Sequence, residues 1–293
     1  MRFFRKAAIG TVKRKKRRAL LLVIAVAFAA AIWWGNNVLR TEEYTFSSPR
    51  LPEGWSGTRI VHLSDLHGKT FGKDNKRLLQ AVADAQPELI VITGDIADQQ
   101  SGLDTIPAVL DGLTAIAPTY YVTGNHEWGA KFVGELKELL EAADVHYLRN
   151  EYVSLQRGGD ELILAGIEDP LGYADQKTPT ELATELYAEQ EDPFWLLLAH
   201  RNNHFSGEYC LLGADLTLSG HGHGGVWRFP FTDGFISTTM ELFPSWTDGF
   251  YTCYCGNCDA SQVFVSRGLG NSPRIPRICN RPEVAVLTLQ TTP

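Results

Sequence analysis

Short apolar runs alternate with amphipathic stretches along the middle of the chain. The runs at 59–64, 89–93 and 119–123 are rich in aliphatic, β-branched and aromatic residues, which is typical of buried strands. The stretches between them, 74–85 and 103–113, place leucine, isoleucine and valine at helical spacing. Strands separated by helices predict parallel βαβ units and therefore an α/β fold.

The rest of the globular part continues this pattern. Helices are expected at 130–142 and 178–191, and strands at 152–155, 162–167, 194–199, 214–218, 263–266 and 284–289. An aromatic-rich segment with many turn-forming residues, 226–260, interrupts the alternation. We interpret it as a packed irregular loop, and a role as a flap over a functional site stays open.

The N-terminal part has a different pattern. Residues 19–35 read ALLLVIAVAFAAAIWWG and contain no charged side chain. As a helix this run would be about 25 Å long, close to the ~30 Å hydrocarbon core of a bilayer. Trp33 and Trp34 stand where aromatic side chains meet lipid headgroups. Nine lysines and arginines precede the run within residues 1–18, and they predict that the N-terminus lies in the cytoplasm.

Four segments follow from this interpretation. They are a basic cytoplasmic segment at 1–18, a transmembrane signal anchor at 19–38, a polar linker at 39–57 and one globular domain at 58–293. A cleaved signal peptide has a similar start, and Arg17-Arg18 is a weak twin-arginine signal. Each alternative exports the globular domain across the membrane.

The charge distribution limits the partners of that domain. The net charge of −7 includes the basic N-terminus, and only 18 of the 27 lysines and arginines remain to offset 34 acids in the rest of the chain. An acidic body argues against nucleic-acid binding, which needs a positive surface.

The five cysteines leave several possibilities open. They are Cys210, Cys253, Cys255, Cys258 and Cys279. An exported protein can keep disulfides, and an odd count leaves at least one thiol unpaired in a monomer. Cys253, Cys255 and Cys258 with a fourth cysteine could alternatively form a structural zinc site.

Candidate site residues, most of them possible metal ligands, collect directly after the expected strands. In chain order they are Asp65, His67, Asp95, Asn125, His126, His200, His221 and His223, the last two within the glycine-rich run 219–225. The carboxyl ends of strands in an α/β sheet face one crevice, so these side chains should converge. Imidazole and carboxylate groups are common ligands of transition metals. The spacing therefore predicts a metal site, whereas His62, inside a strand, is interpreted as structural.

Five sequence blocks carry a family resemblance. They are Asp65-x-His67, Gly94-Asp95, Gly124-Asn125-His126-Glu127, His200 and Gly220-His221-x-His223. In this order they resemble the calcineurin-like metallophosphoesterase family, most closely its membrane-anchored or exported YkuE-like bacterial branch. The resemblance implies a four-layer αββα sandwich and two divalent metal ions, Mn, Fe or Zn.

The resemblance also implies a role for each residue. Asp65, His67 and His223 would bind one metal, Asn125, His200 and His221 the other, and Asp95 would bridge them. His126 would donate a proton to the leaving oxygen, and Asp98 would orient His126. Independently of the resemblance, Arg201 and Arg267 are candidates for bidentate contact with a phosphate.

We therefore expect metal-dependent hydrolysis of a phosphomonoester or phosphodiester at the outer face of the membrane, with a hydroxide bridging two metals as nucleophile. The partner would be a phosphorylated small molecule or a lipid-linked envelope substrate. One alternative is a pyrophosphohydrolase acting on a nucleotide-linked lipid, which the aromatic segment near a membrane motivates. Another is a non-catalytic metal-binding envelope protein that retained the fold.

Overall fold

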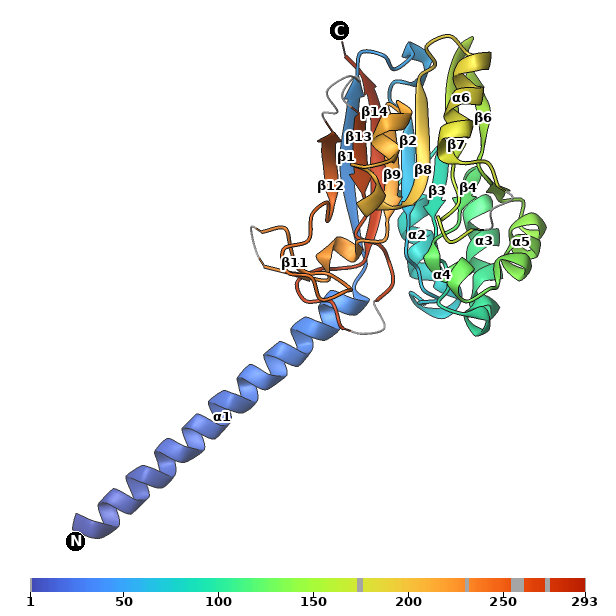
Figure 1. Ribbon diagram of the computed structural model, residues 1–293. Helices are drawn as coiled ribbons and strands as arrows, with labels where there is room; N and C mark the ends of the chain where they lie inside the picture. The colour runs from blue at the N-terminus through green and yellow to red at the C-terminus, as the bar shows by residue number, and fades with distance from the viewer. Residues whose placement is uncertain (1, 173–175, 230–231, 254–260, 272–274, 293) are drawn as a thin grey trace.

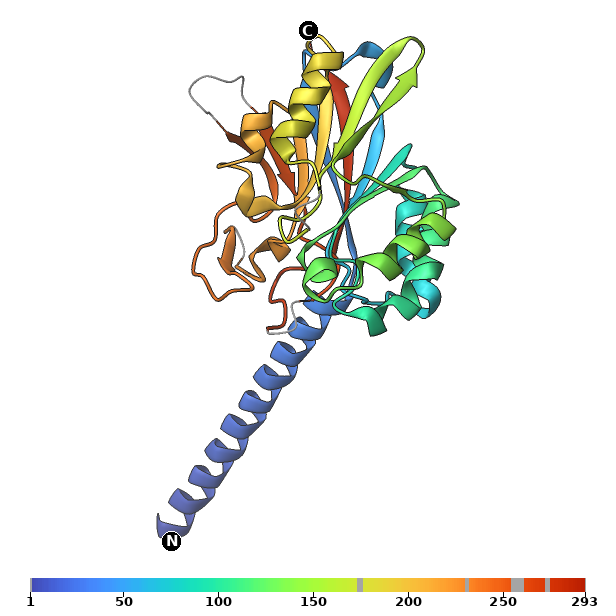
Figure 2. The same cartoon turned by 45° about the vertical axis from the view of Figure 1, so that its right-hand side comes forward.

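The computed structural model describes residues 2–172, 176–229, 232–253, 261–271 and 275–292. These residues form one long N-terminal helix, α1 (Arg2–Asn37), and a domain built on two six-stranded sheets. Figures 1 and 2 show α1 projecting away from the domain.

The first sheet contains the three strands that the earliest apolar runs predict. Its order is β1-β14-β2-β3-β4-β5, and all neighbours are parallel except β14 and β2. The strands are β1 (Arg40–Ser48), β2 (Arg59–Leu63), β3 (Leu89–Thr93), β4 (Thr119–Val122), β5 (His146–Tyr147) and β14 (Glu283–Thr291). The predicted βαβ units are present, because α2 (Lys76–Asp84) and α3 (Ile106–Thr114) connect β2 to β3 and β3 to β4.

The second sheet is parallel at its centre and antiparallel at both edges. Its order is β12-β13-β9-β8-β7-β6. The strands are β6 (Glu151–Arg157), β7 (Asp160–Gly166), β8 (Trp195–Arg201), β9 (Leu216–Gly220), β12 (Gly249–Cys253) and β13 (Ser261–Val265). Segment 226–260 contributes β12 and a small hairpin of β10 (Trp227–Arg228) and β11 (Gly234–Ile236).

Three apolar cores hold the layers together. One lies between the first sheet and the helices α2, α3 and α5 (Val133–Ala142), one lies between the two sheets, and one lies between the second sheet and α6 (Pro179–Glu189). Neighbouring side chains of a strand point to opposite faces, so Val61 enters the outer core and Ile60 the central one. The four-layer αββα sandwich is confirmed.

The prediction of a polar linker at 39–57 is wrong. β1 runs parallel to β14 in continuous register from Arg40 to Ser48, so the domain begins before residue 58. Phe46, only 2% exposed, belongs to the central core together with Leu51 and Trp55. The outward side chains of this edge strand are polar and exposed, and they mask the strand in the sequence pattern.

Two of the cysteines lie close together. The Sγ atoms of Cys210 and Cys253 are 2.9 Å apart. Cys255 and Cys258 lie outside the described residues, so the structure does not test the zinc hypothesis.

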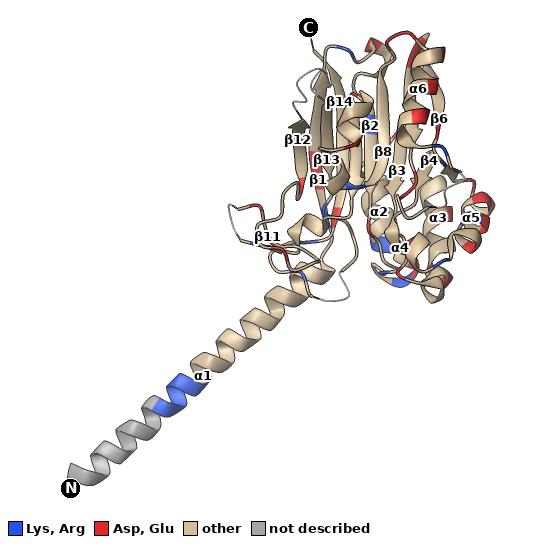
Figure 3. Cartoon of the chain, viewed as in Figure 1, with Lys and Arg blue, Asp and Glu red and all other residues tan. Residues whose placement is uncertain are grey.

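α1 has the dimensions of a membrane span. Residues 14–37 are long and apolar enough to cross a bilayer, and side chains such as Leu22, Val23 and Phe28 are exposed. Figure 3 shows a basic band on α1 followed by an uncharged stretch that leads to the domain.

A test of the corrected domain boundary compares two neighbouring positions of β1. Phe46→Ala is expected to lower the free energy of unfolding by about 3 to 5 kcal/mol, because it empties a site in the central core. Thr45→Ala changes an exposed side chain of the same strand and should cost less than about 0.5 kcal/mol. Urea denaturation in mild detergent measures both. Equal, small effects would mean that this segment is a linker after all.

Candidate metal centre

All seven predicted metal ligands lie at the same edge of the sandwich. Asp65 and His67 follow β2, Asp95 follows β3, and Asn125 begins the short helix α4 (Asn125–Gly129) after β4. The second sheet supplies His200 near the end of β8 and His221 and His223 after β9. The two sheets therefore contribute to one site.

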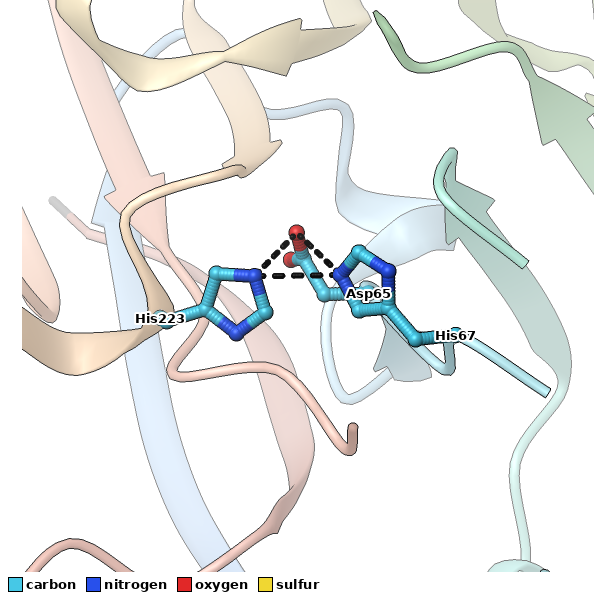
Figure 4. A group of neighbouring side chains, drawn as sticks. All are labelled: Asp65, His67 and His223. Carbon is cyan, nitrogen blue, oxygen red and sulfur yellow. Dashed lines mark hydrogen bonds and ion pairs between the residues drawn. The ribbon is translucent and has the colours of Figure 1, made fainter. Parts of the chain in front are cut away.

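The first group consists of Asp65, His67 and His223. Asp65 Oδ1 lies 3.5 Å from His223 Nε2 and 3.9 Å from His67 Nε2, and the two Nε2 atoms are 3.0 Å apart. Figure 4 shows these three atoms facing one another across a small triangle. All three side chains are buried.

The second group gathers around His200. His200 Nε2 lies 3.3 Å from Asp95 Oδ2, 3.2 Å from Asn125 Oδ1 and 3.2 Å from His221 Nδ1. The same Asp95 oxygen is 3.9 Å from His67 Nε2 in the first group. The Asp95 carboxylate therefore faces both groups.

The hydrogen bonds of the imidazoles show that these groups fit a cation. His67 donates its Nδ1–H to Asp98 Oδ1 over 2.5 Å, and His200 donates its Nδ1–H to the Thr93 carbonyl over 2.7 Å. In the neutral form of each ring, Nε2 then carries a lone pair that points into the site. Lone pairs of carboxylate, amide and imidazole groups converge at a buried point, and a metal ion satisfies them.

Burial and the charge of Asp95 explain the pKa shifts of the histidines in the site. Burial lowers the pKa of His221 to about 3 and holds that of His223 well below its usual range, so both rings are neutral, as metal ligands must be. Burial opposes protonation of His200 as well, but the Asp95 carboxylate outweighs it and raises the pKa of His200 to about 10. A proton on His200 thus offsets the Asp95 charge, and metal binding would release it.

His126 lies at the rim of the site. Its side chain is 30% exposed, its Nε2 is 3.9 Å from Asp95 Oδ2, and its Nδ1 is 3.1 Å from Asp98 Oδ1. The hydrogen bond to Asp98 raises the pKa of His126 to about 9, against a smaller effect of burial. The ring is therefore protonated at neutral pH. Asp98 contacts both His67 and His126. The sequence predicts only the contact with His126.

Comparison with known proteins assigns the family. The model of the calcineurin-like phosphoesterase family matches residues 58–225. The chain belongs to this family. It is a metallophosphoesterase, a metal-dependent hydrolase of phosphate ester bonds, and residues 58–225 contain all seven predicted ligands.

Two relatives and one solved structure illustrate the similarity. The uncharacterized metallophosphoesterase YkuE of Bacillus subtilis is 30% identical to this phosphoesterase over 87% of each chain. A transmembrane protein with metallophosphoesterase domain from Danio rerio is 31% identical over 82% of this chain, which spans only 55% of that protein. TT1561 of Thermus thermophilus, a solved structure, shares 13% identity with a TM-score of 0.46, covering 73% of this chain and 90% of its own.

The loops of this phosphoesterase hold most ligands in a strained backbone conformation. Asp65, His67, Asp95, His221 and His223 have φ between 48° and 65°. Such left-handed conformations cost about 1 kcal/mol or more each for residues other than glycine. Hydrogen bonds between the two loops of the first sheet offset this cost: the Asp65 N–H donates to Gly94 O and the His67 N–H donates to Asp95 O.

Two glycines allow the loops to approach one another. A Cβ atom at Gly124 would lie 2.2 Å from Asp95 Oδ1, and one at Gly220 would lie 1.8 Å from Ser64 Oγ. Any other residue at these positions would force the ligand loops apart.

The sequence prediction gave no role to Glu127. This carboxylate is fully buried and accepts three backbone N–H groups, from Asp95 (3.0 Å), Gly124 (2.7 Å) and Ile96 (2.7 Å). Burial and the nearby Asp95 charge raise the pKa of Glu127 to about 7. Glu127 thus ties the loop after β3 to the loop after β4. In the sequence, the position of Glu127 next to His126 is the signal that could have pointed to it. That position does not distinguish a buried acid from one on the surface.

The two predicted phosphate-binding arginines already contact carboxylates. Arg201 forms a fork with Asp169, with Nε–Oδ2 at 2.6 Å and Nη2–Oδ1 at 3.1 Å. Arg267 Nε and Nη2 lie 2.8 and 2.6 Å from Asp248 Oδ2. Their contact with a phosphate stays a prediction.

A substitution at Glu127 tests its positioning role. Glu127→Gln is expected to lower the free energy of unfolding by about 1 to 3 kcal/mol, because the amide has one acceptor oxygen and turns its NH₂ group toward backbone N–H groups. Glu138→Gln, on the exposed face of α5, is the control. Urea denaturation of both variants measures the effect, and equal stability of the two would exclude this role.

Proposed function

We propose that the two ligand groups hold two divalent metal ions, Mn, Fe or Zn, and that the phosphoesterase hydrolyses a phosphomonoester or phosphodiester. The observation that carries this proposal is the position of Asp95 Oδ2, 3.3 Å from His200 Nε2 and 3.9 Å from His67 Nε2. One shared carboxylate brings two cations together and offsets their repulsion. Mixed nitrogen and oxygen ligands suit these metals better than calcium.

When bound, such ions activate water as a nucleophile and polarise the phosphoryl oxygens. The protein's own residues would hold the ions in position and protonate the leaving oxygen of the substrate. Asp95 and Asn125 present oxygen atoms, and the imidazoles of His67 and His200, fixed by their Nδ1 hydrogen bonds, present nitrogen atoms.

His126 is the proposed proton donor to the leaving oxygen. The Asp98 carboxylate fixes the ring through Nδ1, so Nε2 carries the other proton and lies beside Asp95. An exposed fraction of 30% leaves room for a substrate group to reach it.

The location of the substrate follows from α1. We propose that α1 anchors the enzyme in the cell membrane with its basic end in the cytoplasm and the domain outside. The substrate is then a phosphorylated small molecule or a lipid-linked precursor of the envelope. Exposed aromatic side chains packed against Phe235 of β11, among them Phe229 and Phe243, favour hydrolysis of a nucleotide-linked lipid pyrophosphate as the second candidate function, because β11 lies at the end of the domain where α1 enters (Figure 1).

Metal binding and activity test the two-metal proposal. Equilibrium dialysis of the full chain against Mn²⁺ should give two ions per chain. Asp95→Asn should weaken metal binding and lower hydrolysis of p-nitrophenyl phosphate or its bis-ester by at least about a hundredfold, because it removes the shared charge. His204→Ala is the control, because His204 pairs with Glu208 outside the metal centre. Wild-type activity in Asp95→Asn would contradict the proposal, as would a single bound ion.

The proton-donor role of His126 predicts a dependence on the leaving group. His126→Ala should slow hydrolysis of an alkyl phosphate by about 10² to 10⁴-fold, and hydrolysis of a nitrophenyl ester much less, because nitrophenolate leaves without a proton. Comparing kcat/KM for the two ester classes measures this difference. An equal loss on both would show that His126 does not protonate the leaving group.

A further inference from the structure

The end of α1 is fixed to the domain by a pair of hydrogen bonds. The side-chain amide of Asn36 donates to Arg277 O over 2.8 Å and accepts from Arg277 N over 2.9 Å. Asn36 is only 6% exposed, so this pairing is shielded from water. The contact joins residues 241 positions apart in the chain, and it sets the direction in which α1 leaves the domain.

Cationic side chains of the domain strengthen this junction. Lys69 Nζ donates to Asn36 O, and Arg281 donates to the carbonyls of Val38 and Leu39. The Arg281 guanidinium also lies 4.6 Å from the centre of the Trp34 ring. These contacts satisfy carbonyl groups at the C-terminal end of α1. The domain therefore holds a fixed orientation relative to α1, where a flexible linker would leave it free.

Exposed apolar side chains gather on one loop of the domain. We call Phe229, Met240, Leu242 and Phe243 the apolar patch; they are 48%, 59%, 58% and 71% exposed. Phe235 lies between two of them, with ring centres 5.1 Å from both Phe229 and Phe243. Large apolar side chains grouped on an exposed surface are typical of a contact site.

The apolar patch is connected directly to the junction. Arg228 N donates to Ile278 O over 2.9 Å, and Trp227 Nε1 donates to Pro276 O over 3.1 Å. Strand β10 is therefore bonded to both neighbours of Arg277, the residue that holds Asn36. Figures 1 and 2 agree that the β11 region lies at the end of the domain where α1 enters.

We infer that the apolar patch contacts the surface of the same bilayer that α1 spans. A fixed junction and an apolar loop beside it place phenylalanine, leucine and methionine at the level where Trp33 and Trp34 would meet the headgroups. Asp233 and Glu241 are exposed near the patch, so the contact depends on apolar area and not on attraction to anionic lipid.

This contact would hold the metal centre next to the membrane surface. The backbones of Gly225 and Gly234 pack so closely that a Cβ atom at Gly225 would lie 2.5 Å from Gly234 Cα. Gly225 follows the ligand His223 by two residues, so the hairpin that carries Phe229 of the patch rests against a ligand loop. The inference rests on the membrane attachment proposed above.

Photo-crosslinking of the full chain in nanodiscs of zwitterionic lipid tests the inference. p-Benzoylphenylalanine replaces Phe243 in the patch, Phe28 in α1, or Leu211, which is 62% exposed beside α6 on the outer side of the second sheet. Mass spectrometry then measures lipid adducts. Hydrolysis of a soluble aryl phosphate should be unchanged in all three variants, which reports an intact metal centre.

The expected result is a lipid adduct at Phe28 and Phe243 and none at Leu211. Labelling of Phe28 without Phe243 would overturn the patch contact and leave the membrane anchor standing. Absence of an adduct at Phe28 would reject the anchor itself, and the inference with it. Adducts between two protein chains at Phe243 would show that the patch binds a second copy, which also overturns the inference.

Discussion

The buried carboxylate of Asp95 faces imidazole nitrogens on both sides, and the surrounding structure depends on keeping it there. Asp98 and the Thr93 carbonyl bind the Nδ1–H groups of its neighbours His67 and His200, which turns their Nε2 atoms toward Asp95. A proton on His200 offsets the Asp95 charge, and a bound metal ion would replace that proton. Positive charge beside Asp95 therefore stabilises this arrangement.

The two-sheet architecture makes the site a property of the whole domain. The first sheet supplies Asp65, Asp95 and Asn125, and the second supplies His200, His221 and His223. The ligand groups meet only when the central core packs the sheets face to face. Glu127 and the close approach at Gly124 then fix the loops within hydrogen-bonding distance. Strain in the ligand loops is tolerated because these contacts stabilise them.

Much of the fold and the ligand set could be predicted from the sequence, because both depend on local patterns. Apolar runs indicate strands, and polar residues after strands indicate the edge where ligands collect. The strand β1 could not be predicted in this way. An edge strand has polar outward residues, and only its pairing with β14 shows that Phe46 enters the core. The grouping of the exposed side chains of Phe229 and Phe243 likewise depends on folding.

The glycine-rich run 219–225 shows what the sequence determines and what depends on the tertiary structure. By itself the sequence determined that two histidines stand in a flexible loop after a buried strand, because chain order and side-chain chemistry are local properties. The family resemblance implied that the two histidines bind different metals, and only the tertiary structure showed the contacts themselves, with His221 Nδ1 3.2 Å from His200 Nε2 and His223 Nε2 3.5 Å from Asp65 Oδ1. Both histidines have left-handed backbone, and the His221 N–H donates to the Asp65 carboxylate, which follows a strand of the other sheet and holds this loop in place.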